Sequence, residues 1–216
     1  MPILMSTLIP AVISALGPAL RFSLRLLFAG LLGSALAATS TFALAQTATG
    51  AVASDWSAAD QAKIGRTIAL CLARLRVAPD VAKAKWNSKA PITDAAREAV
   101  VIKDFMARAT EMHLDTQLAG RFISNQIDAS KIVQTALFAQ WQQEQHGLFD
   151  PVPDLGKDVR PLLDQLTPQM LAALQELVPL REKPGFAGQL ARERARIAAD
   201  YAYPAALDAV LAGLTH

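Results

Sequence analysis

The sequence predicts an all-α protein, and three observations support that prediction. Apolar residues recur every three or four positions through most of the chain after residue 56, which is the period of an amphipathic helix. No window alternates apolar and polar residues long enough to indicate a strand, and proline or glycine separates the helical segments. With 52% hydrophobic and 19% charged residues among 216, the composition suits one globular domain rather than a disordered chain.

The first 45 residues have the pattern of a cleavable secretory signal peptide. Arg21 and Arg25 precede an apolar run, which leads to an Ala-x-Ala cleavage site ending at Ala45. A membrane anchor is the alternative, since about 20 apolar residues can span a bilayer, but Gly, Ser and Thr interrupt the run. We therefore expect cleavage after Ala45 and a periplasmic or secreted product without a stable membrane anchor. A flexible spacer is expected over 46–55, and a single helical domain over 56–216.

Charge and cysteine content exclude several functional classes. The chain has 21 basic and 19 acidic residues, and removing the two leader arginines leaves 19 of each. Nucleic-acid binding is therefore not expected, because such proteins carry a clear basic excess. One cysteine, Cys71, and three scattered histidines offer no material for a zinc or iron–sulfur site. Because Cys71 lies in an apolar stripe, we expect a buried structural thiol.

The first helix is expected to begin at Ser57 and to reach about Asn87. Ser57 resembles a capping residue, and apolar residues recur at helical spacing as far as Leu75. Pro79 interrupts this pattern, which then resumes, so the helix should be kinked or divided there.

Two further helices complete the expected core over 56–145. Thr93 should cap a helix that runs to about His113, and Asp115 should cap one over about 116–145. The buried side of the former is predicted to comprise Ala99, Val100, Ile102, Phe105 and Met106. The latter should lie at the centre of the core, with Leu118, Phe122, Ile123, Ile127, Ile132, Val133, Leu137, Phe138 and Trp141 packed inside.

Residues 146–216 should form a C-terminal helical extension. Helical spacing and Pro or Gly punctuation predict segments over about 157–166, 168–182 after Thr167, 186–201 and 204–214. Arg192, Arg194 and Arg196, with Glu193 among them, are interpreted as a solvated face with local ion pairs.

Chemistry has to be sought in side-chain spacing, because the chain lacks the dinucleotide, phosphate-loop, zinc-protease and hydrolase-elbow motifs. Arg74 and Lys85 are eleven residues apart, close to three helical turns, so a continuous helix would place them on one face about 16 Å apart. Gln126, Ser130 and Gln134 step by four and line one polar stripe of a core helix. Taken singly, each of these signals is also compatible with a solvated surface residue.

Together, these residues resemble the all-helical AroQ-type chorismate mutases. The match covers roughly residues 70–141, and its spacing of basic residues is Arg74, Lys85 eleven later and Arg97 twelve later. The matching stretches are Arg74, Pro79-Asp80-Val81-Ala82-Lys83-Ala84-Lys85-Trp86, Pro91-Ile92-Thr93-Asp94-Ala95-Ala96-Arg97-Glu98, and Arg121-Phe122-Ile123 through Ser130 and Gln134. With a leader and an extra helical half, the chain is similar to the exported, gamma class of that family.

The resemblance implies a helical bundle of the AroQ type with additional C-terminal helices, and an isomerase that converts chorismate to prephenate without a cofactor. It also implies a site within one chain and a homodimer. Arg74, Arg97 and Arg160 would bind the substrate carboxylates, with Arg160 supplied by the segment after the third helix. Lys85 and Gln134 would donate to the ether oxygen.

Three further residues complete the implied site. Glu98, with Asp94, would accept from the ring hydroxyl, and Ser130 would be a supporting polar contact. Some family members carry Glu in place of Gln134, and an amide donates at any ordinary pH whereas a carboxylic acid must be protonated. Two alternatives stay open at this stage. One is an isochorismate-pyruvate lyase on the same scaffold, and the other is a non-catalytic exported helical module that binds anions or a partner.

Overall fold

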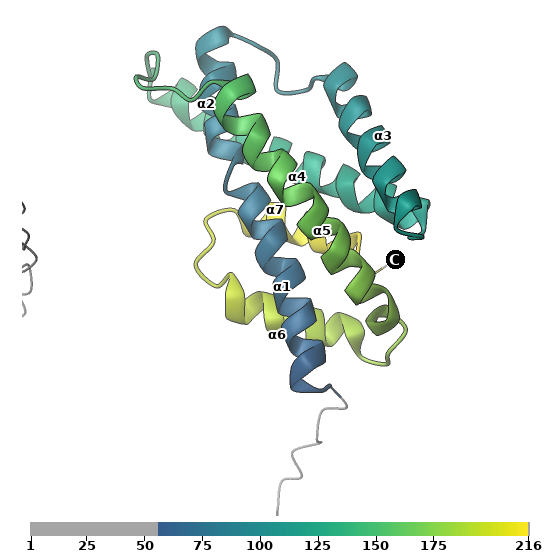
Figure 1. Cartoon of the computed structure of the whole chain (residues 1–216). Helices are drawn as coiled ribbons and strands as arrows, with labels where there is room; N and C mark the ends of the chain where they lie inside the picture. The colour runs from purple at the N-terminus through teal and green to yellow at the C-terminus, as the bar shows by residue number, and fades with distance from the viewer. Residues whose placement is uncertain (1–55, 216) are drawn as a thin grey trace, which may run out of the picture. The chain divides into compact units, whose positions relative to one another are not determined.

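The computed structural model describes residues 56–215, which form helices and contain no strand, so the predicted all-α class is confirmed (Figure 1). In chain order the elements are α1 (Ala58–Leu75), α2 (Ala78–Ser88), α3 (Ala95–Glu111), α4 (Thr116–Gln143), the π-helix η1 (Leu155–Val159), α5 (Arg160–Arg181), α6 (Phe186–Ile197) and α7 (Pro204–Ala212). None of these helices is both long enough and apolar enough to cross a bilayer. The expected leader and spacer, residues 1–55, lie outside the described residues.

Helices α1 and α2 are the two parts of the first expected helix. The Ser57 hydroxyl accepts a hydrogen bond from the Asp60 backbone N–H at 3.0 Å, which caps α1 as predicted. The helix stops at Leu75, and Pro79 lies in the first turn of α2, where its missing N–H costs no helical hydrogen bond. The division at Pro79 is therefore a new helix start.

The cap of α3 is Asp94, one residue after the predicted Thr93. The Asp94 carboxylate accepts from the Arg97 backbone N–H, and the Glu98 carboxylate accepts from the Asp94 backbone N–H, each at 3.1 Å. This arrangement is a variant of the capping box with the returning acid one position later, at N4, and it satisfies two donors that a helix start leaves unpaired. Thr93 has no comparable carboxylate partner, so the helix begins one position later than expected.

The predicted buried face of α3 is confirmed at Phe105 and wrong at Ala99 and Val100. Phe105 and Ala109 are buried and Val101 is half-buried, which makes a stripe at four-residue spacing. By contrast, Ala99 is exposed and Val100 is 45% exposed. The predicted face was wrong there because α3 packs chiefly against α4, so one narrow stripe is covered and its neighbours face solvent.

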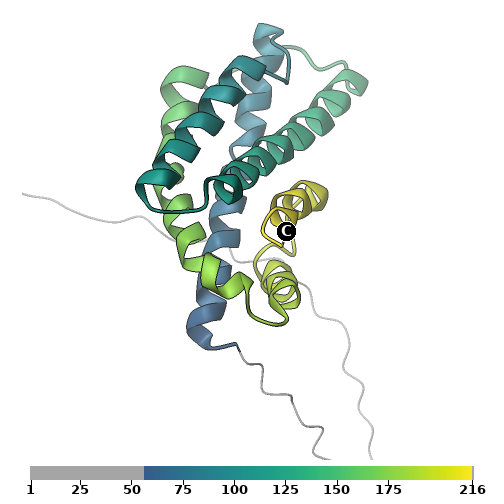
Figure 2. The same ribbon diagram turned by 90° about the vertical axis from the view of Figure 1, so that its right-hand side faces the viewer.

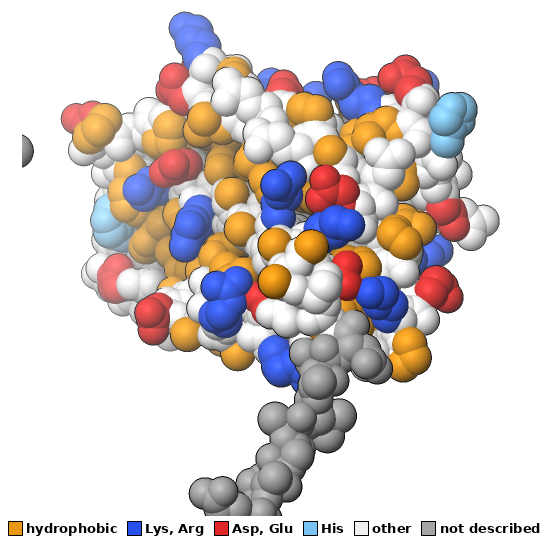
Figure 3. Space-filling model, turned by 60° about the horizontal axis from the view of Figure 1, so that its bottom comes forward, with side chains coloured by type: hydrophobic (Ala, Val, Ile, Leu, Met, Phe, Trp, Pro, Cys, Tyr) orange, Lys and Arg blue, Asp and Glu red, His pale blue; other side chains and the backbone are white. Residues whose placement is uncertain are grey.

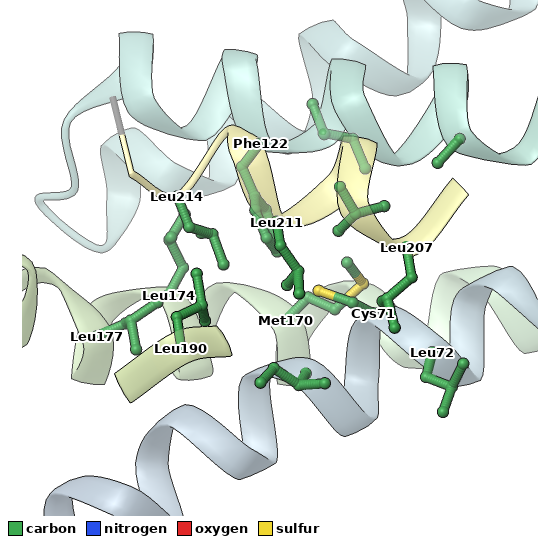
Figure 4. Packing of buried hydrophobic residues seen from close by; sticks show 14 of the residues in the cluster. Cys71, Leu72, Phe122, Met170, Leu174, Leu177, Leu190, Leu207, Leu211 and Leu214 are labelled. Carbon is green, nitrogen blue, oxygen red and sulfur yellow. The ribbon is translucent and has the colours of Figure 1, made fainter. Parts of the chain in front are cut away.

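Helix α4 lies at the centre of the core, in contact with α2, α3 and α7. Asp115 caps it as predicted, accepting from the backbone N–H groups of Gln117 and Leu118. Figure 4 shows Phe122 of α4 among side chains from α1, α5, α6, α7 and the turn after α7, namely Cys71, Leu72, Met170, Leu174, Leu177, Leu190, Leu207, Leu211 and Leu214. Of the predicted core residues on α4, Ile132 is 41% exposed and is not part of the core.

The helix boundaries in the C-terminal half differ from those predicted. The π-helix η1 leads directly into α5, which continues through Pro168 where two separate helices were expected. Thr167 does not cap a new helix, because its hydroxyl donates back to the Leu163 carbonyl at 3.1 Å, as a threonine inside a helix does. Helix α6 also ends at Ile197, short of the predicted 201.

Helix α6 packs closely against α1 through a glycine. A Cβ on Gly65 would lie 3.2 Å from the Ile197 Cδ1 atom and 3.6 Å from a Glu193 carboxylate oxygen. Because of this approach, Glu193 is only 5% exposed, which corrects the expectation of a solvated residue. Its carboxylate accepts from Arg196 at 2.8 and 2.9 Å, so the expected local ion pair is present.

Both views place α6 in the lower half of the bundle and α3 in the upper half (Figures 1 and 2). Seen from below, basic and acidic side chains are interspersed (Figure 3), so that face presents no large patch of one charge. The pocket described next lies among α1–α5, away from α6 and α7.

Candidate active site

One pocket brings together all eight residues to which the family resemblance assigns a role in the site. Its volume is about 170 Å³, and its walls come from α1, α2, α3, α4, η1 and α5, together with the segment before α3. The lining residues are Arg74, Val81, Lys85, Ile92, Asp94, Arg97, Glu98, Val101, Ile127, Ser130, Lys131, Gln134, Leu155, Val159, Arg160, Leu163, Asp164 and Thr167. Residues that are 93 positions apart in the chain therefore share one concave surface.

Arg74, near the end of α1, is the buried cation of the pocket. Only 9% of the residue is exposed, and its Nε atom has no hydrogen-bond partner among the described residues. Burial lowers the pKa of Arg74 to about 10, while Asp164 on α5 and the Cys71 thiol act in the opposite direction. A buried guanidinium without a paired anion is costly, so this position favours an anionic ligand.

Lys85, on α2, is a second, half-buried cation that lines the pocket. Its ammonium donates to the Ile92 carbonyl at 2.5 Å, which fixes one of its three protons and leaves two for a ligand. Burial lowers the pKa of Lys85, and Asp94 and Glu98 partly offset that effect. The side chain is therefore a fixed donor aimed by the segment that precedes α3.

Arg97 and Arg160 are exposed and stand at helix starts on the edge of the pocket. The capping box at Asp94 sets the first turn of α3, and that turn carries Arg97. Asp154 caps η1 by accepting from the backbone N–H groups of Gly156 and Lys157, and this turn leads directly to Arg160. Each cation is thus placed by a local backbone motif.

The connection from α4 to η1 is tied to α2 by hydrogen bonds. The Trp86 indole N–H donates to the Gly147 carbonyl at 3.0 Å. The Asn87 amide donates to the Phe149 carbonyl and accepts from the Phe149 backbone N–H, both at 2.9 Å. These contacts bring the C-terminal half back across α2, so that η1 and the start of α5 line the pocket.

Gln134 and Ser130 line the pocket from α4 and are hydrogen-bonded to each other. The Gln134 Nε2 atom donates to the Ser130 hydroxyl at 3.0 Å, and Gln134 is only 3% exposed. One N–H of the amide remains available, and its Oε1 atom has no partner among the described residues. Gln126, one turn before Ser130, is fully buried, and neither of its amide atoms has a partner there.

Lys131 is a lining residue that the sequence reasoning missed. Its ammonium lies 3.1 Å from Glu98 and 2.8 Å from Asp128, and these carboxylates raise its pKa. Glu98 therefore accepts from Lys131 as well as from the Asp94 backbone. The available signal was the position of Lys131 directly after Ser130, with Asp128 three residues before it.

The charges lining the pocket leave an excess of two positive charges. Five cations face three carboxylates, Asp94, Glu98 and Asp164, while apolar side chains of α2, α3, α4 and η1 cover much of the remaining wall. Such a site suits a compact dianion with an apolar body. Within residues 56–215, no group of three or more His, Cys, Asp or Glu is placed to hold a metal ion.

Comparison with known proteins matches the chain to one family. The family model "Chorismate mutase type II" matches residues 66–135, which include every sequence-predicted site residue except Arg160. A secreted chorismate mutase of Mycobacterium tuberculosis is 29% identical over 121 residues, covering 56% of this chain and 60% of that protein. One from Mycolicibacterium smegmatis is 32% identical over 111 residues, covering 51% of this chain and 61% of that protein. This chain thus matches less than two thirds of the length of each of these two curated relatives.

Among solved structures, a chorismate mutase from Burkholderia thailandensis superposes with a TM-score of 0.67 at 39% identity. That comparison covers 70% of this chain and 98% of the other. The similarity therefore extends over nearly the whole of that relative and beyond the matched motif into the C-terminal helices.

Proposed function

This chain belongs to the type II chorismate mutase family, and on that premise we propose that it rearranges chorismate to prephenate in the pocket between α1 and α5. The observation that carries the proposal is the combination of a net positive lining with the family's spaced residues Arg74, Lys85 and Arg97 in one cavity. Chorismate is a dicarboxylate, so its charge matches the excess of two in the pocket.

The reaction needs positioning and charge stabilisation rather than a nucleophile. In the rearrangement one carbon–oxygen bond breaks as a carbon–carbon bond forms, through a compact chair-like state in which negative charge grows on the ether oxygen. A site can accelerate this by binding the reactive conformer and by aiming fixed donors at that oxygen. No cofactor enters the proposed reaction.

In this proposal the arginines bind the carboxylates. Arg74 is buried and forms no salt bridge within residues 56–215, so a substrate carboxylate would offset the cost of its burial. Arg97 and Arg160, at the exposed edge, would attract the dianion and close on it. Planar guanidinium groups suit this role because they bind a carboxylate with two parallel hydrogen bonds.

Lys85 and Gln134 are the proposed donors to the ether oxygen. Lys85 has two free protons and a position fixed by Ile92, and Gln134 has one free N–H after its bond to Ser130. The contacts of Lys85 and Gln134 with the ether oxygen would strengthen as negative charge grows on it. With Arg97, they are the catalytic residues of the proposal. Glu98, with Asp94, would accept from the ring hydroxyl through a remaining lone pair, since each Glu98 oxygen already accepts one hydrogen bond, from the Asp94 backbone N–H or from Lys131.

We further propose that the protein is exported, with cleavage after Ala45 giving a periplasmic or secreted product, and that it forms a homodimer. Support for export comes from the leader pattern and from the relatives named as secreted. The pocket lining described above is supplied by a single chain, so catalysis is proposed not to depend on the dimer.

The experiment is to incubate the purified protein with chorismate and, separately, with isochorismate, and to identify the products. Arg97→Ala is the test variant, and Arg108→Ala is its matched control, because Arg108 is exposed on the same helix and does not line the pocket. Prephenate formation that is lost in Arg97→Ala and kept in Arg108→Ala is the expected result.

Two outcomes would overturn the proposal. Release of pyruvate from isochorismate, with no prephenate from chorismate, would identify a lyase. Binding of chorismate without turnover by a folded, helical protein would identify a non-catalytic anion-binding module.

A further inference from the structure

Gln126 is the most buried polar side chain of α4, and its amide is unaccounted for. The residue is 0% exposed, and neither Nε2 nor Oε1 has a hydrogen-bond partner among the described residues. An unpaired buried amide costs free energy that an apolar side chain would avoid, so its presence calls for a reason. It does not line the pocket, and the proposed reaction assigns it no role.

Gln126 and a second unpaired buried group, the Arg74 Nε–H, both lie near Cys71. Gln126 lies beside the Cys71 thiol, whose pKa is raised to about 12 by burial against the opposing effects of Gln126 and Arg74. Arg74 follows Cys71 by three residues, so the two side chains lie on one face of α1. Gln126 and Ser130 likewise stack along one face of α4.

The unpaired atoms on these faces of α1 and α4 are a hydrogen-bond donor and an acceptor. The Arg74 Nε–H is a buried donor without an acceptor, and the Gln126 Oε1 is a buried acceptor without a donor. The Gln126 amide also acts on the Cys71 thiol, whose sulfur is a weak acceptor. One chain of contacts, from Cys71 through Gln126 to Arg74, would satisfy both helices.

We propose that Gln126 is a positioning residue for Arg74: its carbonyl accepts the Nε–H of the guanidinium and aims the other N–H groups at a carboxylate of the bound substrate. This inference rests on the proposed function. Apo sites often hold such contacts open until the ligand binds, so the pair closes when the substrate carboxylate fixes the far side of Arg74.

A neutral acceptor suits this position better than a carboxylate. A carboxylate behind Arg74 would neutralise the charge that the substrate dianion needs, and the buried setting would strengthen that competition. An amide orients the guanidinium and leaves its full charge available. Gln126 thus acts on substrate binding and not on the bond-breaking step.

The test compares Gln126→Leu, Gln126→Met and Gln126→Glu by steady-state kinetics with chorismate, with Gln117→Leu as an amide-removal control in the exposed first turn of α4. For the Leu and Met variants we expect KM to rise about tenfold, with kcat changed far less, since the loss is of a charge-assisted hydrogen bond that supports ground-state binding. Thermal unfolding should show that these variants are as stable as the parent or more so.

The Gln126→Glu variant distinguishes a positioning role from a purely structural one, because its effect on KM should depend on pH. At neutral pH the new carboxylate pairs with Arg74 and KM rises; as the pH falls and the carboxyl protonates, KM should return toward the parent value. The other ionisable groups facing Arg74 are the Cys71 thiol and Asp164. A purely structural role for Gln126 would not produce this acid recovery.

The outcomes separate this inference from the proposed function. If the parent protein converts chorismate and the three Gln126 variants keep its KM, the positioning role is wrong and the function stands. A uniform fall in kcat with KM unchanged would also overturn the positioning role. If the parent neither converts nor binds chorismate, the proposed function itself has failed, and the inference falls with it.

Discussion

Turnover of the parent protein should be nearly independent of pH between pH 5 and 8, because the proposed donor at position 134 is an amide. The Gln134 amide carries two protons, of which one is bonded to Ser130 at 3.0 Å, so one N–H is left for the ether oxygen at every pH in that range. Because Gln134 is only 3% exposed, water does not screen this donor. Removing it with Gln134→Leu should lower kcat by about 10²–10³.

Gln134→Glu converts the pH-independent donor into a titrating one. The carboxylic acid donates only when protonated, so kcat should fall about tenfold for each pH unit above the pKa of the new carboxyl group. The assay is the initial rate of chorismate loss at saturating substrate, measured across pH 5–8 for both proteins. A steep loss in the parent as the pH rises, or a flat profile in Gln134→Glu, would refute the amide-donor argument.

Three other predictions address the donor, a cap and the core. Lys85→Ala should lower kcat by about 10²–10³ while KM changes much less, because its ammonium is proposed to bind the ether oxygen most strongly in the transition state. Equal losses in kcat and in affinity would contradict the donor role. Asp94→Ala should reduce the free energy of unfolding by about 1 kcal/mol through loss of the α3 cap, whereas Asp94→Asn, which can cap, should change it by only a few tenths; urea denaturation distinguishes them. Phe105→Ala should cost about 3–5 kcal/mol by leaving a core cavity, against about 0.5 kcal/mol or less for the exposed Val100→Ala, and similar unfolding midpoints for the two would show that the α3 face is misassigned.

Local signals in the sequence predicted the elements that depend on local chemistry. Ser57 and Asp115 cap their helices as expected, because a side-chain oxygen beside a helix start needs no distant partner. The length of α4 followed from its long apolar stripe. Family spacing identified the lining residues Arg74, Lys85 and Arg97, which are far apart in sequence and meet in one pocket.

The features that were missed depend on tertiary contacts. Adjacent Thr93 and Asp94 are both good caps, and only the reciprocal bond with Glu98 selects the second. Whether Val100 or Val101 faces the core depends on the rotation of α3 about its own axis where it packs against α4. The helical period of 3.6 residues does not fix that rotation to within one residue. Lys131 belongs to the pocket because α3 brings Glu98 within 3.1 Å of it, a contact across 33 residues.

Because six helical segments share the pocket lining, enzymatic activity should depend on assembly of the whole bundle. Residues from 74 to 167 contribute, and the chain leaving α4 must be tied to Trp86 and Asn87 before η1 can close the pocket. No single helical hairpin holds enough of the lining to bind a dianion, so the site can exist only after the bundle has assembled. During refolding, activity should therefore appear with the last tertiary contacts to form, well after helix content is recovered.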